Sequence, residues 1–185
     1  MQLSHRTDLV IAAAISLIPV VSMLVFGNML FVGLWYYLLV PAATLTLAIV
    51  MRAKPLFLSG ASLAIAVTLL TYMYINWSST RPEGLLVLGH LFSLPGAAVG
   101  MALAIFLGFR LKHPALLLVI GIGGTACGFL ANQLLVCNSL LWCGPFSREG
   151  LVLLGMMGWS ILIFGTVVLL VVIVSKIRGR DPNAG

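Results

Sequence analysis

Few side chains within the long apolar stretches of this chain could take part in chemistry. His90 is the only histidine in such a stretch, and the amides Asn132 and Gln133 are expected at a similar depth, with Asn76 nearer to the outer surface. An imidazole in this setting can be a ligand contact or a proton sensor, or a neutral ring that donates to a facing carbonyl or to Ser93. Amides bind ligands or hold helices together. We favour the structural interpretation for the histidine and for the amides.

Aromatic side chains gather near the ends of the expected helices that we assign to the outer face. They are Trp35, Tyr36, Tyr37, Tyr72, Tyr74, Trp77 and Trp142. An ordinary aromatic belt marks both membrane interfaces. The bias therefore indicates either a one-sided belt or an outward-facing contact surface or shallow pocket, with His90 and Asn132 nearby. The candidate binding residues are Trp35, Tyr36, Asn76, Trp77, His90, Asn132, Gln133 and Trp142.

Two cysteines could stiffen the one sizeable outer loop that we expect. Cys137 and Cys143 are six positions apart, and in an oxidising compartment they would form a disulfide, whereas otherwise they stay free thiols. Cys127 lies within an apolar stretch and is expected to be a small packing residue. Three thiols and one histidine do not make a convincing zinc site, so no metal is predicted.

The sequence contains none of the catalytic motifs that we searched for. It contains no His-Glu-x-x-His, Gly-x-Ser-x-Gly or Cys-x-x-Cys motif and no acid pair suited to hydrolysis. With the spans placed as below, no Asp, Glu, Lys or Arg lies deep in an apolar span, which argues against an ion-coupled carrier. We therefore expect a protein that is not an enzyme and that needs no cofactor.

The composition assigns the chain to the membrane. Of 185 residues, 62% are hydrophobic and 8% are charged, whereas a soluble domain has about 25% charged residues. The net charge of +6 comes from scattered cations without a basic patch, which is typical of short loops beside anionic lipid and not of nucleic-acid binding. The lipid bilayer is the first expected partner.

Uncharged intervals between the ionisable residues predict six transmembrane helices in a single all-α domain covering residues 1–185. Intervals such as 84–109 suffice for one helix across about 30 Å of hydrocarbon, and 9–51 suffices for two that turn tightly at Gly27-Asn28. We treat the first as a retained span and not as a cleaved signal. The expected spans are 9–27, 29–51, 56–76, 85–109, 115–136 and 151–175, followed by a basic cytoplasmic tail over 176–185.

The cations predict the orientation. With the N-terminus inside, eight of the ten Lys and Arg residues lie on the inner side, and the outer Arg81 and Arg148 each stand close to a glutamate. Both termini are therefore expected in the cytoplasm of a bacterium, with the chain in its inner membrane.

Two expected hairpins resemble each other and indicate either a parallel repeat or chance likeness among leucine-rich helices. Residues 81–89 and 148–155 share the pattern Arg, Glu-Gly, four branched aliphatics and Gly, and both open an outside-to-inside span. The spans that precede them both begin near a proline, Pro55 or Pro114.

Small residues at helical spacing predict the packed faces, because close approach of helices in lipid depends on them. The predicted packing glycines are Gly89, Gly96 and Gly100 of the fourth span and Gly121, Gly124 and Gly128 of the fifth.

The size and the six-span layout with both termini inside are similar to those of the substrate-capturing subunits of vitamin transporters. Small polytopic immunity proteins, which protect bacteria against toxins that attack the inner membrane, are also short and lack catalytic and coupling charges. We expect a non-enzymatic inner-membrane binding protein, most concretely an immunity protein that neutralises a membrane-targeting toxin as in a toxin-antitoxin pair. The alternative is a small-solute carrier or a capture subunit of a transporter, which would bind a small molecule in a cavity beneath Trp35 and His90.

Overall fold

The described part of the protein is an all-helical bundle. A computed structural model describes residues 4–28, 30–78, 86–111 and 113–139, and these residues contain five helices and no strand. They are α1 (His5–Phe26), α2 (Leu34–Val50), α3 (Phe57–Ser78), α4 (Leu86–Gly108) and α5 (Pro114–Ser139). Four are long and apolar enough to cross a membrane, and α2 is shorter at 17 residues. The expected sixth span, 151–175, and the tail lie outside the described residues, so the count of six stays a prediction.

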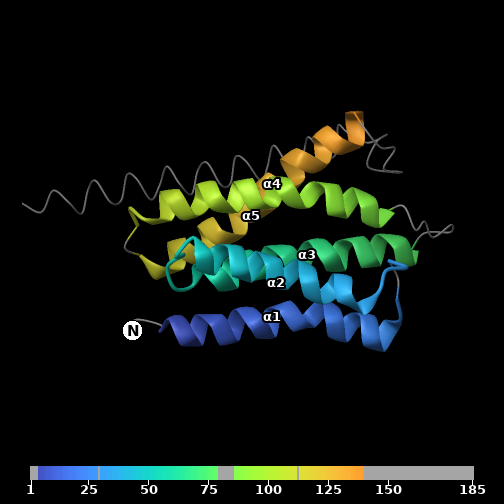
Figure 1. Cartoon of the computed structure of the whole chain (residues 1–185), viewed down its shortest axis with the longest axis horizontal. Coiled ribbons are helices and arrows are strands. Elements are labelled where there is room, and N and C mark those ends of the chain that lie inside the picture. Colours follow the sequence, from blue (N-terminus) through green and yellow to red (C-terminus); the bar gives the residue numbers. More distant parts are fainter. Residues whose placement is uncertain (1–3, 29, 79–85, 112, 140–185) are drawn as a thin grey trace, which may run out of the picture.

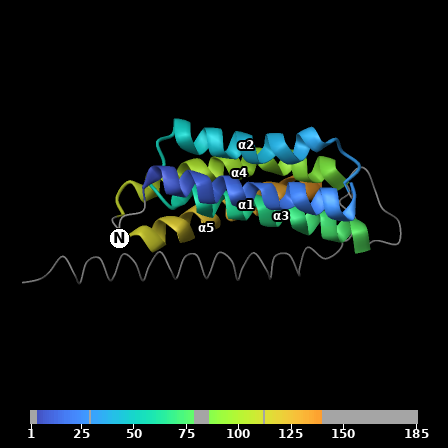
Figure 2. The ribbon, with the colours of Figure 1, turned by 90° about the horizontal axis from the view of Figure 1, so that it is seen from below.

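The helices lie side by side along the long axis of the bundle, and α5 runs obliquely to the others (Figures 1 and 2). Helix α3 packs against each of the other four, and it is the most buried of the long helices. Its central place follows from its composition, because Gly60, Ala61 and Ala64 let neighbouring backbones come close.

Helices α1 and α2 are joined differently from the tight turn that we expected. Gly27, with φ of 93°, ends α1, and α2 begins at Leu34 instead of at residue 29. The connection is held locally, because the side-chain oxygen of Asn28 accepts a hydrogen bond from the N–H of Val32 at 3.3 Å. Gly27-Asn28 thus opens a longer link and does not form the whole turn.

Helix α1 begins earlier than expected, at His5 instead of at residue 9. The Ser4 side chain caps it by accepting a hydrogen bond from the N–H of Thr7 at 3.2 Å. Asp8 therefore lies inside the helix, where it is fully buried. We expected Asp8 to precede the first span, because we placed the start of that span at residue 9.

Buried Asp8 acts as the cap of a neighbouring helix. Its carboxylate accepts hydrogen bonds from the N–H groups of Leu58 and Ser59 at 3.3 and 3.2 Å, and also from the Ser59 hydroxyl. These two N–H groups lie in the first turn of α3, where helical donors have no partner of their own and the helix dipole is positive. The acid joins α1 to α3 because it satisfies those donors.

Lys54 caps the C-terminal end of α4. Its ammonium group donates to the carbonyl oxygens of Phe109 and Leu111 at 2.8 and 2.9 Å. A cation at a helix C-terminus is favourable because the last carbonyls lack partners there. Within the described residues, every charged side chain lies at this end of the bundle, at the start of α1, between α2 and α3, or just after α4. We call it the charged end, and we call the opposite end, whose described residues carry no charge, the uncharged end.

Glycines set the closest helix contacts. Helices α4 and α5 meet through Gly96 and Gly100 on one side and Gly124 and Gly128 on the other, and a Cβ at Gly100 would lie 2.8 Å from the Gly128 Cα. Gly121 faces away from this contact, because a Cβ there would lie 2.7 Å from the Phe57 carbonyl of α3. The predicted glycine face of α5 is therefore divided between two neighbours.

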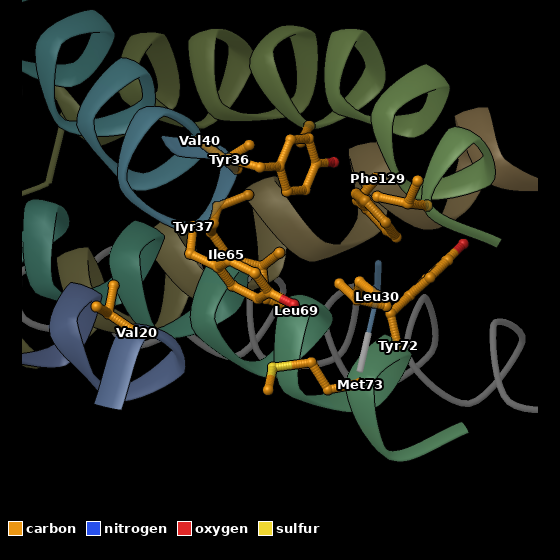
Figure 3. Close-up of a cluster of buried hydrophobic side chains, with 12 residues drawn as sticks. Val20, Leu30, Tyr36, Tyr37, Val40, Ile65, Leu69, Tyr72, Met73 and Phe129 are labelled. Carbon is orange, nitrogen blue, oxygen red and sulfur yellow. The ribbon is translucent and has the colours of Figure 1, made fainter. Parts of the chain in front are cut away.

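The apolar core has one cluster toward each end. The cluster near the charged end is built mainly of alanines with Phe57, Leu58 and Ile105. The cluster near the uncharged end is built of larger side chains, which include Tyr36 and Tyr37 from α2, Tyr72 from α3 and Phe129 from α5 (Figure 3). The rings of the second cluster surround His90, which the sequence singles out.

Candidate functional site

His90 lies at the centre of a buried polar network. Its Nδ1 is 2.8 Å from the hydroxyl oxygen of Tyr36 on α2, and its Nε2 is 3.2 Å from the Oγ1 of Thr68 on α3. These partners differ from those we expected, since the Ser93 hydroxyl donates to the Gly89 carbonyl at 2.7 Å. The imidazole thus ties α4 to both α2 and α3.

Aromatic rings enclose the same imidazole. Tyr36 and Tyr72 stand edge-on to it at centroid distances of 5.9 and 5.0 Å, and Phe129 lies at 5.0 Å in a tilted arrangement. His90 is 0% exposed. With both nitrogens engaged and all faces covered, the ring has no room for a ligand in this conformation.

Gln133 forms a second buried polar pair beside this network, with Tyr72, whose ring contacts His90. Its side-chain amide donates to the Tyr72 hydroxyl, and both residues are buried. Asn76, one turn further along α3, is also buried and has an interaction partner of its own. Two buried polar groups near the uncharged end therefore link four helices. Tyr36 and His90 join α2 to α4, and Tyr72 and Gln133 join α3 to α5.

The remaining candidates do not join this network. Asn132 lies on the α4–α5 face, where its amide donates to the Phe92 carbonyl and where it lines a separate open groove. Trp35 and Trp77 are 62% and 63% exposed on the bundle surface. Trp142 lies outside the described residues. The structure thus gives Asn132 and His90 different partners. The outward-facing contact surface or shallow pocket stays a prediction, as does the one-sided belt.

A cavity of 370 Å³ lies between α2 and α4, beside the network. Its lining comes mainly from these two helices, with one residue each from α3 and α5: Trp35, Tyr36, Leu39, Val40, Ala43, Thr44, Leu47, Ile65, Leu91, Leu94, Pro95, Ala97, Ala98, Met101 and Thr125. The cavity lies partly beneath Trp35, as the carrier alternative requires, but His90 is not among its lining residues. Its volume is in the range of about 300–1,000 Å³ that is common for small-molecule sites.

Sequence reasoning missed two polar residues that the fold makes important, Asp8 and Thr68. The first could have been recognised as an acid in the first turn of a helix capped by Ser4. Thr68 carried no signal, because small polar residues are common in membrane helices and only the packing shows what they face.

Among the described residues, no group of three or more His, Cys, Asp or Glu is placed to hold a metal ion. Cys127 is a free thiol that lines the α4–α5 groove. Cys137 is buried near the end of α5 and is disulfide-bonded. Its expected partner, Cys143, lies outside the described residues, so the identity of the partner stays a prediction.

Comparison of the chain with protein-family models, with curated proteins and with solved structures finds no match. Functional inference therefore depends on the geometry of the bundle itself.

Proposed function

We propose that this chain is a non-enzymatic integral membrane protein of the bacterial inner membrane that binds another protein, and that it serves as an immunity protein against a membrane-targeting toxin. In this proposal six spans place both termini in the cytoplasm and the uncharged end outside. Binding would use the outer surface and would require neither catalysis nor a cofactor.

The exposed rings at the uncharged end are the observation that carries this proposal. Trp35 lies in the first turn of α2, Tyr74 and Trp77 lie in the last turns of α3, and each is more than 60% exposed. Phe26 at the end of α1 and Phe31 in the following link add two more exposed rings at the same end. Aromatic side chains that are exposed together are typical anchors of protein interfaces, where they fill pockets of the partner.

The buried polar groups support the same interpretation. His90, Tyr36, Tyr72 and Gln133 are bonded to one another or to Thr68 and are enclosed by the core. Their hydrogen bonds hold the helices in place, so recognition is left to the surface.

Gene deletion tests the proposal. Cells that lack the gene should become sensitive to one toxin encoded nearby, and the wild-type gene should restore protection. A Trp77→Ala variant should protect poorly although it accumulates in the membrane, because an exposed ring contributes little to folding. Phe109→Ala is the matched control, since Phe109 is 51% exposed but lies at the charged end. A deletion strain without toxin sensitivity and without a neighbouring toxin gene contradicts the proposal.

A second candidate, a small-solute carrier or a capture subunit of a transporter, is favoured by the cavity between α2 and α4. Two substitutions distinguish the two proposed functions. Filling the cavity with Ala98→Phe should abolish solute capture and leave toxin protection intact, whereas Trp77→Ala should have the reverse effect. Loss of protection in Ala98→Phe with normal membrane levels would instead assign the partner to the cavity.

A further inference from the structure

We infer that the open groove between α4 and α5 is the docking site of the chain's own last apolar run, residues 151–175, which lies in it antiparallel to α5. This contact goes beyond the proposed protein partner, which meets the exposed rings at the uncharged end. The inference follows from the length of the groove, a polar side chain in it, the place where α5 ends and the spacing of small residues in the run.

The groove has the length and the borders that suit a helix. Its volume is 600 Å³, and its lining residues on α5 extend from Gly124 to Leu135, which is about 16 Å at 1.5 Å per residue. The glycines of the α4–α5 contact line it together with Val99, Leu103 and Leu135, which are 61%, 62% and 67% exposed. Helices pack by placing a ridge of side chains into such a groove.

One polar side chain in the groove favours a protein cover over lipid. Asn132 lines the groove and is partly exposed there, although its amide donates to the Phe92 carbonyl. An amide that faces hydrocarbon is unfavourable, whereas amides between packed helices are common in membrane proteins. A helix in the groove would remove Asn132 from contact with lipid.

The chain supplies a segment of helix length next to the groove. Helix α5, which forms one wall of the groove, ends with Ser139 at the uncharged end (Figure 1). Residues 151–175 contain no charged side chain and suffice for one crossing of the bilayer. A crossing that starts at the uncharged end finishes at the charged end, where the cations that follow residue 175 would join the others.

A short link keeps the start of the run close to α5. Residues 140–150 span at most about 40 Å when fully extended. Cys137 is disulfide-bonded, and with Cys143 as its expected partner the free part of the link is shorter still. The cavity between α2 and α4 lies on another face of α4, so it is farther from the end of α5 and is a poorer docking site for this run.

Small residues give the run a face that matches the groove. Gly155, Gly158 and Gly165 share one helical face with Leu162, because these positions are three, four and three residues apart. Such a face lets a helix come close to a neighbour in lipid. Cys127 is twelve residues before Ser139 and Leu162 is eleven after residue 151, so antiparallel packing brings Leu162 to the depth of Cys127.

Cysteine cross-linking tests the contact, because Cys127 is a free thiol that lines the groove. The full chain with Leu162→Cys is oxidised by copper phenanthroline in native membranes, and mass spectrometry of the digested, unreduced protein identifies the linked peptides. We expect Leu162→Cys to be linked to Cys127 about tenfold more than Phe164→Cys, which lies at a similar depth on the opposite face of the run. Equal linkage at the two positions, or no linkage in Leu162→Cys, overturns the inference.

A variant that fills the groove makes the test specific. In the Leu162→Cys background, Ala131→Phe should reduce the link by about fivefold, because the larger side chain occupies the place of the run. Ala14→Phe is the matched control, since Ala14 is an exposed alanine of α1 outside the groove, and it should leave the link unchanged. An unchanged link in Ala131→Phe, or an equal loss in Ala14→Phe, overturns the inference.

A second copy of the chain is the competing occupant of the groove. In that case Cys127 of one molecule would be linked to Cys127 of another in the wild type, and a dimer on a non-reducing gel would overturn the inference. A link that needs Leu162→Cys and stays within one molecule supports it. Toxin protection is measured separately in the deletion strain, so failure of this inference leaves the proposed function standing.

Discussion

We expect the buried hydrogen bond between Tyr36 and His90 to contribute to the stability of the bundle. Tyr36→Phe removes only the hydroxyl and leaves His90 Nδ1 without its partner at 2.8 Å. We expect a loss of about 1–3 kcal/mol in the free energy of unfolding, because the substitution leaves the buried Nδ1 atom of His90 without a hydrogen-bond partner. Unfolding in mixed detergent measures it.

A double-mutant cycle with His90→Phe completes this prediction. Removing both partners should cost less than the sum of the two single changes, since neither polar group then stays unpaired. Tyr74→Phe is the control, because Tyr74 is 63% exposed, and it should change stability little. Additive losses in the cycle would show that the pair is not coupled.

Asp8 carries the second prediction at this scale. Asp8→Ala leaves the N–H groups of Leu58 and Ser59 unpaired at the start of α3, and we expect stability to fall by about 1–3 kcal/mol. Thermal unfolding in detergent is the measurement. Arg6→Ala is the control, because Arg6 is an exposed residue of the same helical turn. A loss of stability of equal size in Arg6→Ala would show that stability depends on the charge of this region and not on the cap that Asp8 provides.

At the scale of the elements, the glycine contact between α4 and α5 is the feature most sensitive to side-chain size. Gly100→Leu should force the helices apart, because any Cβ there meets the backbone of Gly124 and Gly128. We expect the midpoint of thermal unfolding to fall clearly, since overpacking typically costs about 1–3 kcal/mol or more. Leu107→Ala on the same helix should matter much less, because Leu107 is 50% exposed. Equal tolerance at both positions would contradict the close α4–α5 contact.

At the scale of the whole molecule, the charges of the described residues are separated from the aromatic end of the bundle. All charged side chains of the described part lie at one end, and Asp8 and Lys54 at that end also cap helices that come from elsewhere in the chain. The charged end is thus both the expected cytoplasmic face and the place where the side chains of Asp8 and Lys54 join helix ends. The uncharged end is joined instead by tyrosine, histidine and amide pairs.

Cysteine labelling tests the orientation that follows from this separation. In cells, an impermeant reagent should modify single cysteines placed at Ser79 and Ser147, which lie outside the described residues, but not one placed at Arg52, because the positive-inside rule keeps that end in the cytoplasm. Labelling after cell lysis is the control for accessibility at Arg52, which is exposed in the fold. Labelling of the Arg52 position in intact cells would show that the orientation in the membrane is the reverse of the one we expect.

The amino-acid sequence by itself determined that this chain is helical, apolar and suited to a membrane. Each backbone polar group in lipid must be satisfied within its own segment, so an uncharged run of sufficient length predicts a helix wherever it occurs. The runs from Pro55 to Thr80 and from Gly84 to Phe109 contain α3 and α4 for that reason. The small residues of α4 could be recognised in the same way, because their spacing is local.

Only the tertiary structure decided which residues meet. His90 pairs with Tyr36 and Thr68, which are 54 and 22 residues away along the chain, and Asn132 lies apart from Gln133 although the two are adjacent in sequence. Such pairings depend on the rotation and tilt of each helix, and these are set by packing against several neighbours at once. The cap that Asp8 provides for α3 and the cavity between α2 and α4 have the same origin: both join helices that are distant in sequence, so no local pattern of residues records them.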